Sequence, residues 1–195
     1  MSKHKSKKAA SPRKPADTTA GLRKALNARS KPELVNALLE LAQADRGVLR
    51  QLTARFDVAA APKELVAATR QAIADATDFD EREINNNFDY DYEAYEEVKR
   101  NLARLIASGN LREAMTLSLE LMKQGSRQVE MSDEGMMTDD IEECLNVVLK
   151  ELKKGDLAAN DVIAWCSAMR ANDRTGFIAE EPLESLRKHA QAASQ

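Results

Sequence analysis

The sequence predicts an all-α protein whose antiparallel helical hairpins stack in a solenoid-like body of about eight or nine helices. Only 4 % of its 195 residues are aromatic, 31 % are charged, and Ala and Leu are frequent, a composition that suits helices better than sheets. Apolar residues recur three or four positions apart along most of the chain, and Gly or Pro interrupts the pattern at short intervals. Both features predict short amphipathic helices that cover one another's apolar faces.

A central hairpin is predicted over residues 93–123, where two helices meet at a tight turn. The stripe on the first helix consists of Tyr95, Val98, Leu102, Leu105 and Ile106, and that on the second of Ala114, Leu117, Ser118, Leu121 and Met122. Gly109 can adopt the left-handed conformation that ends a helix. Asn110, with Glu113 three positions later, resembles a capping box that begins the next helix. We expect a loop over residues 124–137.

Four helices are predicted before this hairpin, over residues 21–28, 30–44, 48–56 and 62–77. In the first of them, Leu22 and Leu26 should face inward. The second has a wide apolar face and the clearest start. Ser30 is its cap, Pro32 lies in the first turn where a missing N–H costs nothing, and Glu33 follows three residues after the cap.

Three helices are predicted after the hairpin, over residues 138–154 and 157–169 and from residue 182. The first should bury a stripe made of Ile141, Leu145, Val148, Leu149 and Leu152. We expect Trp165 to be a packing anchor, and Cys144 and Cys166 to be small buried thiols rather than a disulfide. Asp173 and Arg174 would stabilise a bend or bind a ligand, and the structural role is favoured because Asp is common in turns.

The distribution of charge divides the chain. Residues 1–31 contain ten basic residues and one acidic residue, a net charge of +9, and the whole chain carries −3, so residues 32–195 carry about −12. We expect four parts, which are a disordered basic arm (1–19), an N-terminal helical unit (20–77), an acidic-aromatic connector (78–92) and a C-terminal unit of helical hairpins (93–192). The arm should be disordered because it can bury too little apolar surface to offset the entropy of ordering.

The basic arm is a candidate nucleic-acid contact, since cations that neutralise phosphates release counterions. Its candidate residues are Lys3, Lys5, Lys7, Lys8, Arg13 and Lys14. The arm lacks interleaved aromatic residues that would stack on bases. Two alternatives remain open: the arm folds back on the acidic body, or it keeps the protein soluble.

The most unusual composition lies in residues 78–97, which contain nine carboxylates and five of the eight aromatic residues. One interpretation is a recognition surface that presents acid-rimmed aromatic faces to a basic partner peptide. Its contact set would be Phe88, Tyr90, Tyr92 and Tyr95. The other interpretation, which we favour, is a connector whose aromatic residues anchor it on the neighbouring helices. A calcium loop is disfavoured because the Gly that an EF-hand turn requires is absent.

The residues that catalysis or metal binding would need are scarce. The chain has two His, two Cys without zinc-ligand spacing, and seven Gly that form no phosphate-binding loop. We therefore expect no enzyme, no cofactor and no metal site. No run approaches the roughly 18 apolar residues of a membrane helix, and the N-terminus lacks the apolar region of a secretory signal. We expect a cytoplasmic protein that does not enter the membrane.

Two resemblances add to this pattern. The segment GNLREAMTLSLELMKQG resembles the second helix of a tetratricopeptide-type unit, in which a small Ala after a Gly turn admits the neighbouring helix. A wider resemblance lies in the order of KPELVNALLELAQADRGVLRQL, FDYDYEAYEEVKRNLARLIASGNLREAMTLSLELM and WCSAMRANDRTGFI. This order resembles the uncharacterised helical region that follows the zinc finger in bacterial SWIM-domain proteins. The CxC and CxH zinc ligands of that finger do not occur here, so the resemblance implies a helical scaffold without the finger and transfers no site residues.

These observations predict a non-enzymatic helical scaffold or adaptor that binds a protein partner through a helical groove and the acidic-aromatic segment. The alternative is a nucleic-acid-associated accessory factor that uses the basic arm. An enzyme would need a pocket with converging polar groups, which the sequence does not reveal.

Overall fold

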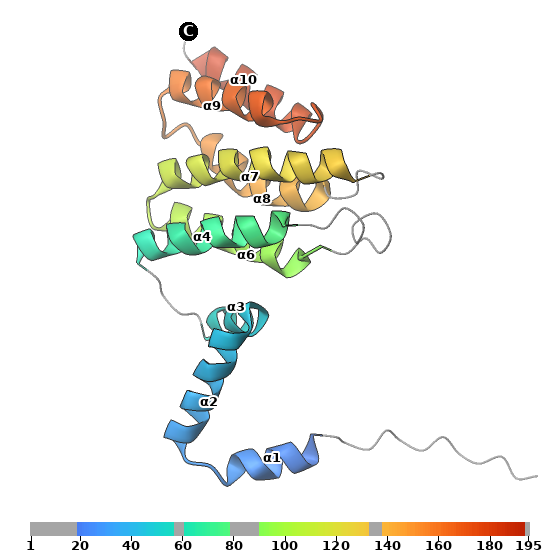
Figure 1. The fold of residues 1–195 in the computed structure, drawn as a ribbon. Helices are drawn as coiled ribbons and strands as arrows, with labels where there is room; N and C mark the ends of the chain where they lie inside the picture. Colours follow the sequence, from blue (N-terminus) through green and yellow to red (C-terminus); the bar gives the residue numbers. More distant parts are fainter. Residues whose placement is uncertain (1–18, 57–60, 79–89, 133–137, 194–195) are drawn as a thin grey trace, which may run out of the picture. The chain divides into compact units, whose positions relative to one another are not determined.

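The computed structural model describes residues 19–56, 61–78, 90–132 and 138–193, and within these ranges the chain forms helices joined by turns, without a strand. This result confirms the predicted all-α class. The chain divides into an N-terminal unit, Met1–Phe56, and a C-terminal unit, Asp57–Gln195. Figure 1 shows the helices of both units.

The described part of the N-terminal unit contains the helices α1 (Ala20–Asn27), α2 (Lys31–Ala44) and α3 (Arg46–Arg55). The predicted capping box begins α2, since Ser30 Oγ accepts from the Glu33 N–H and Glu33 Oε2 accepts from the Ser30 N–H at 2.8 Å. Asp45 ends α2 and begins α3, because its Oδ1 accepts from the Gly47 N–H at 2.7 Å. α2 packs against α3.

The described part of the C-terminal unit contains α4 (Pro62–Thr77), α6 (Tyr92–Ala107), α7 (Leu111–Met131), α8 (Thr138–Leu152), α9 (Ala159–Asn172) and α10 (Glu180–Ala193). These helices form three pairs, since α4 packs on α6, α7 on α8, and α9 on α10 (Figure 1). The pairs stack on one another, because α7 contacts both α4 and α9 while α8 contacts both α6 and α10. This arrangement is consistent with the predicted stack of hairpins.

A hydrophobic core runs through the C-terminal unit. The stripe predicted on α8 is buried over its whole length, as Ile141, Leu145, Val148, Leu149 and Leu152. Trp165 is the predicted anchor, since it is buried and its Nε1 donates to the Met115 carbonyl at 3.0 Å. Cys144 and Cys166 are buried and form no disulfide, as the sequence predicts.

The turn between α6 and α7 contains the predicted left-handed glycine. Gly109 has a φ of 78°, its N–H donates to the Ile106 carbonyl, and the Asn110 N–H donates to the Leu105 carbonyl. These are the two hydrogen bonds of a Schellman motif. The prediction of a capping box at Asn110 is wrong, because its side-chain amide donates to the Ser108 carbonyl and no side chain caps α7.

The prediction of a loop that begins at residue 124 is wrong, since α7 continues to Met131. Gly125 lies inside this helix, where a Cβ atom would come within 2.7 Å of Ile141 Cδ1 on α8. The sequence pattern treats this Gly as a helix stop, whereas in the fold it allows close packing of two helices. Residues 133–137 of the predicted loop lie outside the described residues.

The prediction that α4 belongs with the N-terminal helices is also wrong. Its buried residues Leu65, Ala72, Ile73 and Ala76 belong to the core of the C-terminal unit, and α4 contacts α6 and α7. The Arg70 guanidinium of α4 donates to both carboxylate oxygens of Glu120 on α7, at 2.9 to 3.0 Å. The division between units therefore falls after Phe56 rather than after residue 77.

Candidate interaction surfaces

Tyr95, one member of the predicted contact set, lies in the core. Its side chain is 1 % exposed, and its hydroxyl donates to Gln128 Oε1 at 2.5 Å. Gln128 Nε2 donates in turn to the Ala76 carbonyl at 3.0 Å, so one buried chain of hydrogen bonds joins α6, α7 and α4. Burial raises the pKa of Tyr95 well above its ordinary value. This position corrects the prediction of a surface contact, because Tyr95 offers no accessible face.

Tyr90 anchors the segment that leads into α6. Its ring is half-buried, it meets the Tyr95 ring edge to face at 6.1 Å between centroids, and its hydroxyl donates to Asp140 Oδ2 at 2.6 Å. Burial and the neighbouring Asp140 carboxylate raise the pKa of Tyr90 to about 12. This is the behaviour that the connector interpretation expects of the aromatic residues.

The three described members of the predicted contact set therefore do not share one surface. Tyr92 is 54 % exposed at the start of α6, and Phe88 lies outside the described residues. Among the described members of the set, Tyr92 alone is exposed. The predicted nucleic-acid contacts also lie outside the described residues, namely Lys3, Lys5, Lys7, Lys8, Arg13 and Lys14.

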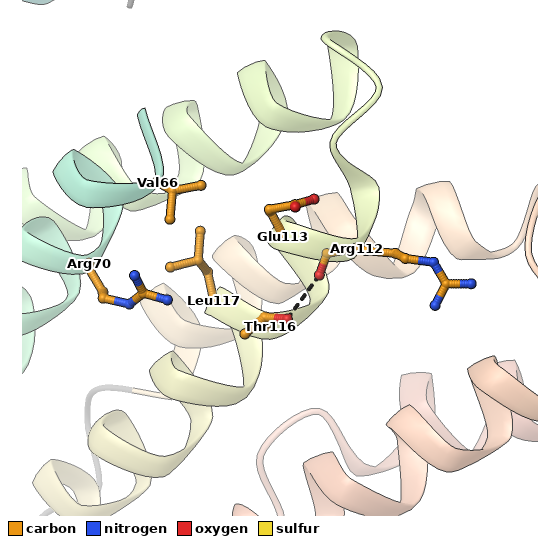
Figure 2. A pocket seen from close by; sticks show the side chains of 6 residues that line it. All are labelled: Val66, Arg70, Arg112, Glu113, Thr116 and Leu117. Atoms are coloured by element: carbon orange, nitrogen blue, oxygen red, sulfur yellow. Dashed lines mark hydrogen bonds between the residues drawn. The ribbon is translucent and has the colours of Figure 1, made fainter. Parts of the chain in front are cut away.

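A shallow hollow of about 140 Å³ lies between α4 and α7 and is lined by Val66, Arg70, Arg112, Glu113, Thr116 and Leu117 (Figure 2). Val66 and Leu117 approach each other there, while the Arg112 side chain points away from them. Glu120 pairs with Arg70, and Asp161 pairs with Arg112 at 2.8 Å. The hollow could accept one small side chain of a partner. Its two arginines, Arg70 and Arg112, are already paired with carboxylates and do not point toward a common reacting group.

The cysteines have no features of catalytic nucleophiles. Burial raises the pKa of the Cys144 thiol to about 12 and that of the Cys166 thiol to about 11, so both are protonated at neutral pH.

In the described ranges, no cluster of three or more His, Cys, Asp and Glu side chains is placed to hold a metal ion. None of the described helices is both long enough and apolar enough to cross a membrane.

The bend after α9 is held by its own residues, as the structural interpretation of Asp173 and Arg174 predicts. Asp173 accepts from the N–H groups of Thr175 at 3.0 Å and Ile178 at 2.9 Å. Arg174 donates to Glu130 on α7 at 2.9 Å. These contacts attach the bend to the body of the C-terminal unit and leave no feature that points to a ligand.

The N-terminal unit has the most prominent exposed surface among the described residues. Its exposed large apolar side chains, between 41 % and 63 % accessible, are Leu22, Leu26, Val35, Leu38, Leu39, Leu41, Leu49 and Phe56. Within its described part, Ala42 alone among the apolar residues is buried. The expectation that Leu22 and Leu26 face inward is therefore wrong. In the described C-terminal unit, the comparable exposed residues are Tyr92 and Phe177.

Burial of these exposed apolar side chains would contribute a substantial stabilising free energy. Full burial of a Leu or Val side chain contributes about 1.5 to 3 kcal/mol, so a side chain left half exposed forfeits about 1 kcal/mol. Eight such side chains leave several kcal/mol available to whatever protein surface covers them. Large exposed apolar surfaces mark interaction sites on soluble proteins. The composition of residues 78–97 predicts an aromatic contact set, whereas the sequence signal for this exposed surface is the wide apolar face of α2.

Comparison with known proteins identifies no relative, since no family model, no curated protein and no solved structure matches this chain.

Proposed function

We propose that this protein is a non-enzymatic helical scaffold or adaptor and that its N-terminal unit is the docking module. In this proposal the exposed apolar face of α1, α2 and α3 binds another protein, while the stacked helix pairs of the C-terminal unit, a tetratricopeptide-like repeat body, form a stable support. The observation that carries the proposal is the contrast in burial. Eight large apolar residues are exposed in the 38 described residues at 19–56, whereas in the described part of the larger C-terminal unit the large apolar residues exposed to a comparable degree are Tyr92 and Phe177.

The proposed contact surface differs from the one predicted from the aromatic residues. Tyr95 is in the core and Tyr90 is hydrogen-bonded to Asp140, so neither is available without disturbing the fold. The residues of α2 meet a stronger criterion, because they are apolar, exposed and carried on a helix with a complete capping box. A capped amphipathic helix presents its apolar face as a ready surface for another helix.

A site-specific photo-crosslinking experiment tests this role. A photoactivatable residue placed at Leu38 lies on the apolar face, and one placed at Glu40 lies on the opposite side of the same helix. In the native cell we expect the Leu38 position to give a discrete cross-linked protein band and the Glu40 position to give none. Equal labelling from both positions, or no adduct from Leu38, would overturn the proposal.

A second candidate function is nucleic-acid binding, because the positive charge of the arm continues into the described N-terminal unit. Residues 19–56 contain seven basic residues and three acidic residues. A salt series of gel-shift measurements with the full chain and with a chain that lacks residues 1–18 tests this role. Weaker binding and a smaller salt dependence after deletion would support it. Equal binding by both chains would exclude the arm.

A further inference from the structure

We infer that the middle of α7, on the face that α4, α7 and α9 form together, binds an acidic segment of another protein in an extended conformation. Lys123 and Arg127 are the central residues of this site and are called the ridge cations. The inference goes beyond the proposed function, because it assigns a second docking surface to the chain. An adaptor joins two partners, and the face of the N-terminal unit accounts for one of them.

Ion pairs on both sides of α7 show where the ridge cations lie. On one side, Arg70 of α4 pairs with Glu120 at 2.9 Å. On the other side, Arg174 in the bend after α9 pairs with Glu130 at 2.9 Å. At about 100° per residue, the ridge cations fall between Glu120 and Glu130 around the helix. They therefore face solvent along the middle of α7, which packs against both α4 and α9.

The ridge cations form a local excess of positive charge. Both are exposed, and within the described ranges neither side chain takes part in an ion pair or a hydrogen bond. They are four positions apart on one helix, where like charges repel each other. Arg70, Arg112 and Arg174 add three cations to the same face, each paired with one carboxylate. A carboxylate bound between the ridge cations would relieve their repulsion, so the face is complementary to an acidic partner.

The hollow between α4 and α7 lies on the same face, toward the beginning of α7 (Figure 2). Thr116 lines it, together with the apolar side chains of Val66 and Leu117. With a rise of about 1.5 Å per residue, Lys123 and Arg127 lie about 10 Å and about 16 Å along the helix from Thr116. Long side chains on a helix lean toward its N-terminus, which brings both charges nearer to the hollow.

These distances fit an extended polypeptide segment. Such a segment advances about 3.3 Å per residue, and its alternate side chains point to one side. When a small apolar side chain occupies the hollow, the residues two and four positions away lie about 7 and about 13 Å along the face, opposite the ridge cations. The segment that fits therefore has a small apolar residue with acidic residues two and four positions from it.

The chemistry of the face favours a polypeptide over a nucleic acid. A nucleic-acid single strand is bound by a continuous positive groove and by aromatic side chains that stack on its bases. α7 contains no aromatic residue, and Glu113 and Glu130 lie toward its two ends. The apolar hollow also offers no hydrogen-bond partner to a phosphate group, whereas it suits a side chain such as Val or Ala.

Fluorescence anisotropy with the purified full chain tests the inference. The probe is a labelled peptide of the order Gly-Ser-Val-Ser-Asp-Gly-Glu-Ser. The interface is small and its charges are exposed, so we expect a dissociation constant on the order of 100 µM that rises with salt. Lys123→Glu combined with Arg127→Glu should weaken binding by about tenfold or more. Absence of saturable binding at peptide concentrations up to about 1 mM would overturn the inference.

A matched control separates the ridge cations from net charge. Arg100 of α6 and Lys150 of α8 are exposed and lie on helices outside this face. Arg100→Glu combined with Lys150→Glu changes the net charge by the same amount and should leave the peptide affinity unchanged. Circular dichroism should show the same helical content for both double variants, because all four side chains are exposed. Equal loss of affinity in the two double variants would overturn the inference.

Two further probes test the hollow and the class of partner. A peptide with Gly in place of Val should bind about threefold more weakly, because an apolar contact is lost. Thr116→Phe, which fills the hollow, should remove this difference. Equal binding of the two peptides to the unaltered chain would contradict the extended placement, and displacement of the peptide by an oligothymidylate of equal charge would overturn the choice of a polypeptide. Leu38→Arg should not affect peptide binding, so this test is independent of the docking role of the N-terminal unit.

Discussion

The helices of the two units are similar in their capping and apolar patterning, yet the units differ sharply in how far the apolar faces of those helices are covered. α2 has a complete capping box and a wide leucine-rich arc, and α8 has a comparable apolar stripe. The stripe of α8 is at most 3 % exposed, whereas Leu39 and Leu41 on α2 are 55 % and 56 % exposed. Periodicity therefore identifies the apolar face of a helix, but burial depends on whether a second element is present to pack against it.

The units also differ in how their charges are used. In the C-terminal unit, ion pairs such as Arg70–Glu120 and Lys99–Glu143 join different helices, and Arg174–Glu130 joins the bend after α9 to α7. In the N-terminal unit, Arg29 pairs with Glu33 one helical turn away. Exposed pairs contribute about 0 to 1 kcal/mol each, so they do not create the difference in burial. The packing of apolar side chains creates the difference in burial.

The largest expected effect comes from truncating one Leu in each unit. Leu121→Ala removes a side chain that is fully buried on α7 and should lower the free energy of unfolding by about 3 kcal/mol. Leu39→Ala removes one that is 55 % exposed and should change it by less than about 0.5 kcal/mol in dilute protein. Urea unfolding followed by circular dichroism measures both. Similar losses from the two variants would mean that the face of α2 is already covered within one chain.

A smaller effect should distinguish the buried tyrosine from the exposed one. Tyr95→Phe removes the hydroxyl that donates to Gln128 and leaves a buried acceptor unpaired, which should cost about 2 kcal/mol. Tyr92→Phe changes a side chain that is 54 % exposed and should be nearly neutral. The same urea unfolding experiment measures the two free energies. A neutral Tyr95→Phe would contradict the buried hydrogen-bond chain.

The tyrosines also predict a loss of stability in alkaline solution. The pKa of Tyr90 is about 12 in the fold, against about 10 in the unfolded chain, and the pKa of Tyr95 is also raised. Between these values the folded chain binds more protons than the unfolded chain, so the free energy of unfolding falls as the pH rises above about 10. Tyr90→Phe combined with Tyr95→Phe should make this decline shallower in urea titrations at pH 9 to 12. An unchanged slope would contradict it.

The smallest expected effect concerns glycine in the helices. Gly125→Ala improves helix propensity by about 1 kcal/mol, but its new Cβ collides with Ile141 and should cost more than that, for a net loss of about 1 kcal/mol. Ile141→Val removes the Cδ1 atom that lies closest, so the double variant should lose less than the sum of the two single variants. Thermal unfolding measures this coupling. At Gly21 of α1 no atom lies within 4 Å, so Gly21→Ala should bring no such penalty.

Much of the fold could be predicted from the sequence alone. The capping box at Ser30, the Schellman glycine at Gly109 and the stripe of α8 depend on residues within one or two helical turns, and each was predicted correctly. Gly125 was misread because its role depends on Ile141, which lies on the next helix. α4 was assigned to the wrong unit for the same reason, since one leucine-rich helix resembles another until their neighbours are known.

The candidate contact residues were harder to predict from the sequence than the fold was. Its aromatic contact set came from composition, and composition cannot distinguish a Tyr that faces solvent from one whose hydroxyl meets Gln128 in the core. The described residues place Tyr95 inside and Tyr92 outside, although they are three positions apart on α6. The wide face of α2 was visible in the sequence, but its exposure was not.

The sequence by itself determined that this protein is helical, where most of its helices begin and end, and that a basic N-terminal segment precedes an acidic remainder. These properties follow from side-chain spacing, caps and residue counts, which act over a few residues. The tertiary structure alone decided which faces are covered, because Tyr90 meets Asp140 and Arg70 meets Glu120 across 50 positions of sequence. Such contacts depend on how whole helices pack, and that packing leaves the face of α2 open for a partner.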